Sequence, residues 1–168
     1  MMTSTRIERL AEEVVNEAKA CGLTLATAES CTGGRLAKAL SDAPGAAQYF
    51  HGSFVTYTKA MKAAVLDVPI KLLAREGAVN EEVALAMAKG ALARAPADLA
   101  VAVTGVAGPE PDEDGNPVGL VYCAVMRRGE AGRAVRLMLG DVSKEQILEA
   151  AIGQALELLQ ENCVRAAA

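Results

Sequence analysis

The sequence contains no tryptophan and only one histidine, His51, among its 168 residues. A single histidine excludes a zinc site built on two or three histidines, and a Ser-His-Asp hydrolase would have to use His51 itself. His51 stands between Phe50 and Gly52, where a lone histidine is more often a surface or capping residue than a catalytic one. The scarcity of histidine therefore removes much of the common hydrolase chemistry.

Cysteine and positive charge are also scarce. The four cysteines form no C-x-x-C pair, and the chain is neither short nor cysteine-dense in the way of a secreted disulfide scaffold. Lysine and arginine number 17 against 21 aspartate and glutamate residues, which gives a net charge of −4. Because the lysines and arginines form no basic cluster in the sequence, we do not expect nucleic acid to be the main partner.

Long apolar runs are missing as well. The longest nearly uncharged apolar stretch, residues 97–108, is too short to cross a bilayer. The first twenty residues carry several acids and lack the apolar core of a signal peptide. We therefore expect a cytoplasmic protein that makes no contact with a membrane.

Apolar residues recur at helical spacing in three segments, which indicates amphipathic helices. Asn80 is a favourable N-cap, because two glutamates follow it in the first helical turn. The last helix is predicted to open at Asp141 or Ser143. Helices are predicted over residues 7–21, 35–40, 59–66 and 80–95. The last predicted helix runs from Asp141 or Ser143 to residue 159.

Short apolar or β-branched runs between these helices predict strands. Because helices and strands alternate, the fold class is α/β: a mixed, mostly parallel sheet with helices on both faces and an antiparallel pair late in the chain. No internal repeat or linker interrupts the pattern, so we predict a single domain. The strands are predicted over residues 23–28, 52–58, 99–103, 118–126 and 132–139.

Two loops at the predicted carboxyl ends of strands are candidates for a site, because open α/β sheets place their ligands there. The first is Glu29–Gly34, whose backbone N–H groups at a helix N-terminus would stabilise an anion or a developing oxyanion. The second is Thr104–Pro109, which follows the most buried predicted strand. Both compositions are also typical of ordinary turns.

Ser30 is a possible nucleophile without a familiar signature. It has neither a G-x-S-x-G elbow nor an S-x-x-K motif around it, and the chain has no P-loop. A serine hydroxyl still needs a base. Cys31 competes with Ser30, because a helix N-terminus would lower the pKa of its thiol, although most cysteines are small buried hydrophobes.

Tyr57 and Lys62 are candidate partners for the nucleophile. Tyr57 is predicted at a strand end, and Lys62 in the first or second turn of the following helix. Burial lowers the pKa of a lysine and allows it to act as a base, whereas most lysines are merely solvated. From the residues alone, the base remains open between a lysine, an acid and a tyrosine.

Four motifs, taken in order, resemble the carboxy-terminal domain of the CinA family. The resemblance covers about residues 5–160, which makes a single domain of nearly the whole chain. The motifs are Thr27–Gly34, Val55–Tyr57 with Lys62, Gly77–Val79 before an acid-capped helix, and Thr104–Pro109 followed by Pro117–Gly119.

The resemblance implies a nicotinamide-nucleotide amidohydrolase, which converts nicotinamide mononucleotide to nicotinic acid mononucleotide and ammonia in pyridine nucleotide recycling. It implies that Ser30 is the nucleophile, Lys62 its base, and Tyr57 a hydrogen-bonding partner in the same cluster. It implies no metal or other cofactor, and a homo-oligomer. The residues that it places around the substrate are Glu29, Cys31, Thr32, Gly33, Gly34, Thr104 and Gly105.

The sequence departs from the family pattern in two places. Residues 110–114 are acidic where relatives have a glycine-rich stretch, and Val142 and Gln146 stand where relatives have arginines. If those arginines hold a phosphate or an interface, we expect Lys144 or Arg136 to replace them here. Two alternatives stay open: a non-catalytic nucleotide-binding or regulatory module linked to competence or DNA damage, and a thiol amidase that uses Cys31.

Overall fold

A computed structural model describes residues 4–140 and 142–164, and its five strands form one sheet in the order β2-β1-β3-β4-β5. Strand β1 pairs in parallel with β2 and β3, whereas β4 pairs antiparallel with β3 and β5. Only β4 therefore runs against the other four, which confirms the predicted mixed, mostly parallel sheet. The strands are β1 (Leu25–Glu29), β2 (Phe50–Val55), β3 (Leu99–Gly105), β4 (Leu120–Arg127) and β5 (Arg133–Met138).

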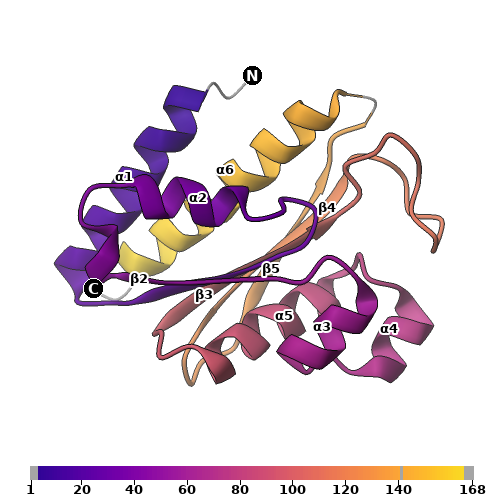
Figure 1. Cartoon of the computed structure of the whole chain (residues 1–168), viewed down its shortest axis with the longest axis horizontal. Coiled ribbons are helices and arrows are strands. Elements are labelled where there is room, and N and C mark those ends of the chain that lie inside the picture. The colour runs from indigo at the N-terminus through magenta and orange to yellow at the C-terminus, as the bar shows by residue number, and fades with distance from the viewer. Residues whose placement is uncertain (1–3, 141, 165–168) are drawn as a thin grey trace.

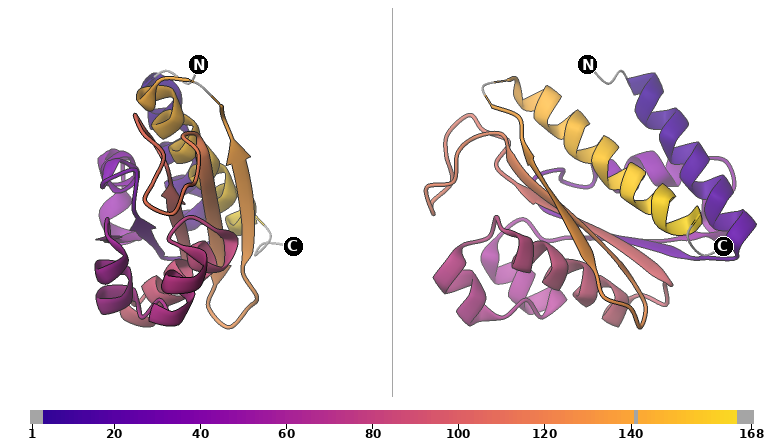
Figure 2. Two further views of the ribbon diagram at one scale, coloured as in Figure 1. Left: turned by 90° about the vertical axis from the view of Figure 1, so that its right-hand side faces the viewer. Right: turned by 180° about the vertical axis from the view of Figure 1, so that it is seen from behind.

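Helices cover both faces of this sheet, as predicted (Figure 1). Helices α1, α2 and α6 lie on one face and α3, α4 and α5 on the other, and the view from behind shows the same three layers (Figure 2). None of the helices in the described part of the chain is both long and apolar enough to span a bilayer. The helices are α1 (Ser4–Cys21), α2 (Arg35–Asp42), α3 (Lys59–Leu66), α4 (Ile70–Glu76), α5 (Glu81–Arg94) and α6 (Lys144–Val164), with a 3-10 turn at Ala46–Gln48.

The two central strands alternate in side-chain size rather than in polarity, because both faces of the sheet are buried. Large residues pack against α1 and α6, and alanines on the opposite face pack against α5. The small side chains let α5 lie close to the sheet. The large residues are Leu25, Leu99, Val101 and Val103, and the alanines are Ala26, Ala28, Ala100 and Ala102.

The predicted helix openings agree with the observed caps. Asn80 Oδ1 accepts a hydrogen bond from Val83 N at 2.9 Å, which confirms Asn80 as an N-cap. Gln146 N donates to Ser143 Oγ and Ser143 N donates to Gln146 Oε1, a reciprocal capping box. The last helix therefore opens after Ser143, while the alternative opening at Asp141 lies outside the described residues.

Two local details differ from the sequence prediction. Helix α4 was not predicted, because seven residues are too few to show helical periodicity, although Pro69 before it and Gly77 after it are typical boundary residues. The strand predicted over 52–58 ends at Val55, because Thr56 N donates its last hydrogen bond to Glu29 O before the chain turns into α3. This early end places Tyr57 in a loop.

Helices α3 and α5 approach each other most closely at Gly90. A Cβ atom on Gly90 would lie directly against the carbonyl oxygen of Leu66 and 2.8 Å from its Cβ. Glycine inside a helix normally costs stability relative to alanine. Here the missing side chain allows the contact that places α3, and hence Lys62, against the sheet.

We predict that Gly90→Ala destabilises the protein by about 1–3 kcal/mol, because overpacking at Leu66 outweighs the gain in helix propensity. Urea unfolding followed by circular dichroism measures this difference. The control is Lys89→Ala, an exposed neighbour in the same helix, which is expected to stay within about 0.5 kcal/mol of the wild type. A stabilised Gly90→Ala variant contradicts the close-approach argument.

Candidate active site

The carboxyl ends of β1 and β3 open into a cavity of about 450 Å³. Both candidate loops of the sequence analysis reach it, the first through Ser30 and Cys31 and the second through residues 104–108. Residues 57–59, the acidic segment 110–114 and Lys144 complete much of the wall. The cavity therefore lies where an open α/β sheet is expected to bind ligands.

Ser30 follows β1 directly and is nearly buried, with 7% of its surface exposed. Its backbone N donates to Val103 O at 3.0 Å, which ties the turn after β1 to β3. Successive side chains of a strand point to opposite faces, and at this strand end Glu29 contacts α2 while Ser30 contacts α3. The position of Ser30 is thus set by the register of β1.

Lys62 is fully buried, and its Nζ lies 2.7 Å from Ser30 Oγ. The same nitrogen donates to the carbonyl oxygen of Thr56 at 2.8 Å. Thr58 Oγ1 accepts from Met61 N and caps α3, which orients the helical turn that carries Lys62. Serine and lysine, 32 residues apart in the sequence, therefore form a direct pair.

Burial lowers the pKa of Lys62 from 10.5 to about 8. Within residues 4–140 and 142–164, no carboxylate forms an ion pair with Lys62 to oppose this shift. A substantial fraction of neutral amine is then present near neutral pH. A neutral amine in contact with a serine hydroxyl can accept its proton.

Glu29 lies on the opposite side of the strand end, away from the cavity. Its buried carboxylate accepts hydrogen bonds from the first turn of α2, where the helix dipole favours a negative charge. Glu29 and Thr32 are not part of the cavity wall, and the Glu29 carboxylate accepts from Thr32, α2 and Ser53; their predicted contact with a substrate stays a prediction. The donors are Thr32 Oγ1 at 2.7 Å, Ala37 N at 2.9 Å, Gly34 N and Ser53 Oγ at 3.0 Å, Leu36 N at 3.2 Å and Thr27 Oγ1 at 3.5 Å.

Gly33 and Gly34 also lie outside the cavity wall. Gly33 N donates to Ser30 O at 3.1 Å, and Gly34 N donates to Glu29. Both residues have positive φ, 56° and 95°, which explains why the turn uses glycine. The predicted anion site at the N-terminus of α2 is thus already filled by an internal anion, the Glu29 carboxylate.

Cys31 lines the cavity beside Ser30. Burial raises the pKa of its thiol to about 12, with Lys62 opposing the rise and the Glu29 charge adding to it. The expectation of a lowered pKa is wrong, because burial outweighs Lys62 and the backbone hydrogen bonds of Cys31 and Thr32, which oppose the rise. A protonated thiol is a poor nucleophile.

Tyr57 stands at the rim of the cavity with 71% of its surface exposed. The second partner of Lys62 Nζ is the carbonyl oxygen of Thr56 and not the Tyr57 hydroxyl. His51, the other residue considered as a base, is exposed on the edge strand β2 outside the cavity wall. Neither Tyr57 nor His51 therefore takes part in the contact between Ser30 and Lys62.

Thr104 and Gly105 line the cavity, as expected. Thr104 Oγ1 donates to Ala78 O at 2.8 Å, which joins the end of β3 to the segment before α5. A Cβ on Gly105 would lie 2.7 Å from Val121 Cγ2, so the β3–β4 pair excludes a larger residue. Of the two basic residues expected to replace the family arginines, Lys144 lines the cavity, and Arg136 is not part of its wall.

Lys59 also lines the cavity, which the sequence did not indicate. Its Nζ lies 2.6 Å from Asp114 Oδ1 and 2.9 Å from Glu113 Oε1, and all three residues line the cavity. The acidic composition of residues 110–114 was visible in the sequence, but its partner in α3 was not. No group of three histidine, cysteine or acidic side chains lies ready to hold a metal within the described ranges.

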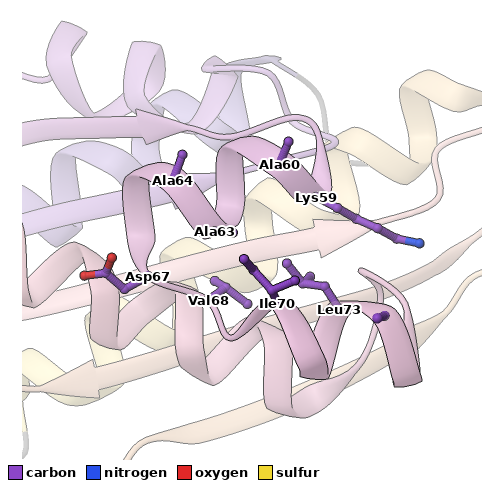
Figure 3. A pocket seen from close by; sticks show the side chains of 9 residues that line it. Lys59, Ala60, Ala63, Ala64, Asp67, Val68, Ile70 and Leu73 are labelled. Atoms are coloured by element: carbon purple, nitrogen blue, oxygen red, sulfur yellow. The ribbon is translucent and has the colours of Figure 1, made fainter.

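A larger hollow of about 740 Å³ lies between α3 and α4 (Figure 3). Its wall is mainly apolar and includes Ala60, Ala63 and Leu73, whereas the Lys59 ammonium points away from these side chains. Ser30 and Lys62 are not part of its wall. The reactive groups therefore belong to the smaller cavity.

Comparison with known proteins gives the family of the chain. The sequence profile of the CinA C-terminal domain matches residues 7–163. The chain is 40% identical to the nicotinamide-nucleotide amidohydrolase PncC of Escherichia coli strain K12, over 96% of this chain and 97% of that protein. It is 45% identical to a CinA-like protein of Desulfotalea psychrophila over 83% of this chain, but over only 33% of that longer protein.

Solved structures show the same fold. A CinA superfamily protein of Klebsiella pneumoniae superposes with a TM-score of 0.89 and 36% identity, over 95% of this chain and 98% of that one. A competence/damage-inducible protein of Agrobacterium tumefaciens gives a TM-score of 0.87 and 41% identity, over 91% and 93% of the two chains. The chain spans about a quarter to a third of the first curated relatives that it matches, 26% and 33% of their lengths. On this evidence, the chain belongs to the CinA family, through its C-terminal domain.

Proposed function

We propose that this protein hydrolyses the carboxamide of nicotinamide mononucleotide to nicotinic acid mononucleotide and ammonia. The observation that carries the proposal is the 2.7 Å contact between Ser30 Oγ and the buried Lys62 Nζ. Membership in the CinA family and 40% identity to the E. coli amidohydrolase over nearly both chains support the choice of reaction. Ser30 acts as the nucleophile and Lys62 as the general base.

In the first half-reaction, neutral Lys62 takes the hydroxyl proton of Ser30 while Oγ attacks the amide carbon. The tetrahedral intermediate collapses when the Lys62 ammonium returns the proton to the leaving nitrogen. Ammonia departs, and an ester joins Ser30 to the nicotinoyl group. The carbonyl oxygen of Thr56 holds Lys62 Nζ in place through both proton transfers.

In the second half-reaction, neutral Lys62 takes a proton from water, whose oxygen attacks the ester carbon. The bond to Ser30 Oγ breaks, and the Lys62 proton returns to Oγ. Because the N–H groups of Gly33 and Gly34 already have partners, we assign neither of them to the oxyanion. Glu29 acts as a positioning residue, since it anchors the turn that carries Ser30 to α2.

The cavity of about 450 Å³ lies in the size range of small-molecule sites. We propose that Cys31, Thr104 and Gly105 contribute to its wall around the substrate, with Tyr57 at the rim as a hydrogen-bonding partner of the substrate. The proposed setting is pyridine nucleotide recycling in the cytoplasm, without a metal or other cofactor. A homo-oligomer remains a prediction that light scattering tests.

Ser30→Ala is expected to lower ammonia release from nicotinamide mononucleotide by about a thousandfold or more, because it removes the nucleophile. A coupled ammonia assay measures this loss, and circular dichroism checks that the fold persists. Full activity in the variant overturns the mechanism. Thermal stabilisation of the wild type by the nucleotide, with no ammonia released, instead supports a non-catalytic nucleotide-binding module.

Cys31→Ala is expected to retain ammonia release within a few-fold of the wild type, because a thiol whose pKa is raised to about 12 carries almost no thiolate. It is the matched control for Ser30→Ala, since the two residues are adjacent in the same turn. The measurement is kcat/KM for both variants side by side. An inactive Cys31→Ala with an intact fold supports a thiol amidase.

The pH profile is expected to reflect Lys62. Because the base must be neutral, kcat/KM rises with pH and levels off above an apparent pKa of about 8. Initial rates between pH 6 and pH 10, with buffers overlapped to remove specific buffer effects, measure the profile. A rate that falls through this window argues against Lys62 as the base.

Lys62→Met is expected to be inactive yet at least as stable as the wild type at pH 7, because it removes a buried charge. The folded pKa of Lys62 lies below its unfolded value, so the unfolded chain binds more protons between about pH 8 and 10.5. Wild-type stability therefore rises with pH in that window, and its difference from Lys62→Met shrinks. Urea unfolding of the wild type and of Lys62→Met at pH 7 and pH 9.5 tests whether their difference in stability becomes smaller as the pH rises.

A further inference from the structure

Lys59 lies at the cavity wall in an unusual position for a lysine, held by two carboxylates at once. Its Nζ is 2.6 Å from Asp114 Oδ1 and 2.9 Å from Glu113 Oε1. Its side chain is only 29% exposed. Both neighbouring carboxylates raise the pKa of Lys59, so it is a permanent cation at neutral pH.

The segment that supplies these carboxylates, residues 110–114, is an ordered turn; we call it the acidic strap. Asp112 Oδ1 accepts hydrogen bonds from Asp114 N at 3.0 Å and Asn116 N at 2.8 Å. Asp114 Oδ2 also accepts from Ala78 N at 3.4 Å. The strap is thereby held in a shape that presents Glu113 and Asp114 to Lys59.

The charge balance of the cavity is unfavourable for an anion while the strap is in this position. Four carboxylates and three lysines line the cavity, and one of the lysines, Lys62, has a lowered pKa. A substrate with a phosphate group needs a cation, and carboxylates near that group repel it. Lys59 is one helical turn before Lys62 in α3, on the same side of the helix.

We propose that Lys59 binds the phosphate of the substrate and that Glu113 and Asp114 compete with that phosphate for the same ammonium group. The inference rests on the proposed function, because it assigns the phosphate subsite of that same cavity. In the free enzyme the two carboxylates occupy Lys59, and the bound phosphate replaces them. The strap thus sets the affinity and the selectivity for phosphorylated over unphosphorylated substrates.

If the ion pairs with Lys59 are only structural, neutralising Glu113 and Asp114 changes the affinity for the substrate in the opposite direction. If Glu113 and Asp114 only hold the loop in place, their neutralisation loosens the cavity and weakens substrate binding. If they compete with phosphate, their neutralisation strengthens it. The sign of the effect therefore separates the two roles.

The experiment compares nicotinamide mononucleotide with nicotinamide riboside, which lacks the phosphate, in steady-state kinetics. We expect Lys59→Gln to raise KM for the mononucleotide about tenfold with kcat within twofold, and to leave KM for the riboside unchanged. Lys59→Arg keeps the charge and is expected to retain the preference for the mononucleotide. The matched control is Lys38→Gln, which breaks an exposed ion pair with Asp42 on α2, outside the cavity.

The double variant Glu113→Gln/Asp114→Asn is expected to lower KM for the mononucleotide several-fold, and adding Lys59→Gln is expected to abolish that gain. An unchanged KM ratio between the two substrates in Lys59→Gln overturns the inference, as does a raised KM for the mononucleotide in the double variant. Circular dichroism of each variant confirms its fold.

Calorimetric binding of nicotinamide mononucleotide to the Ser30→Ala background repeats the comparison without turnover. If the wild type releases no ammonia but binding still depends on Lys59 and the strap, the reaction assignment fails and the phosphate subsite stands. If ammonia is released but Lys59→Gln changes neither KM nor Kd, the proposed phosphate subsite is wrong and the proposed reaction is retained.

Discussion

A lysine amine buried against a serine hydroxyl is the interaction on which the rest of the site depends. Lys62 Nζ lies 2.7 Å from Ser30 Oγ, and Gly90 of α5 leaves room for Leu66 in the helix α3 that carries this lysine. The same burial that lowers the pKa of Lys62 to about 8 makes the amine useful as a base. The packing of α3 therefore sets the protonation behaviour of Lys62, because water admitted around the amine would bring its pKa back toward the ordinary value of a lysine.

The end of β1 places Glu29 and Ser30 on opposite faces of the sheet. Glu29 points toward α2, and six hydrogen-bond donors from α2, the turn before it and strands β1 and β2 surround its carboxylate, whereas Ser30 contacts Lys62 of α3. The N–H groups of Gly34, Leu36 and Ala37 at the start of α2 donate to Glu29, while burial raises the pKa of the Cys31 thiol. The negative charge is thus kept from pairing with Lys62, which leaves the lysine without a carboxylate partner in the described part of the chain.

Much of the fold follows from local patterns, and the differences have identifiable causes. The N-caps Asn80 and Ser143 mark helices in the sequence because their side chains bind backbone groups three residues away. Helix α4 is too short to show periodicity, and it packs through Leu73, a contact with residues distant in the chain. The candidate site was predicted in part: Ser30 and Lys62 meet, and Thr104 and Gly105 line the cavity, whereas Glu29 and Thr32 do not.

The sequence by itself determined the α/β class, the two loops at strand ends and the family, since these depend on periodicity, caps and motifs that lie close together along the chain. Only the tertiary structure shows that Ser30 contacts Lys62 and how burial changes the pKa values of Cys31 and Lys62. The protonation states of Cys31 and Lys62 depend on burial, and burial depends on helices that arrive from elsewhere in the chain. The pairing of Lys59 with Glu113 and Asp114, more than fifty residues later, likewise exists only in the folded chain. The sequence offers a single histidine, and in the folded chain His51 lies outside the cavity wall while Lys62 contacts Ser30.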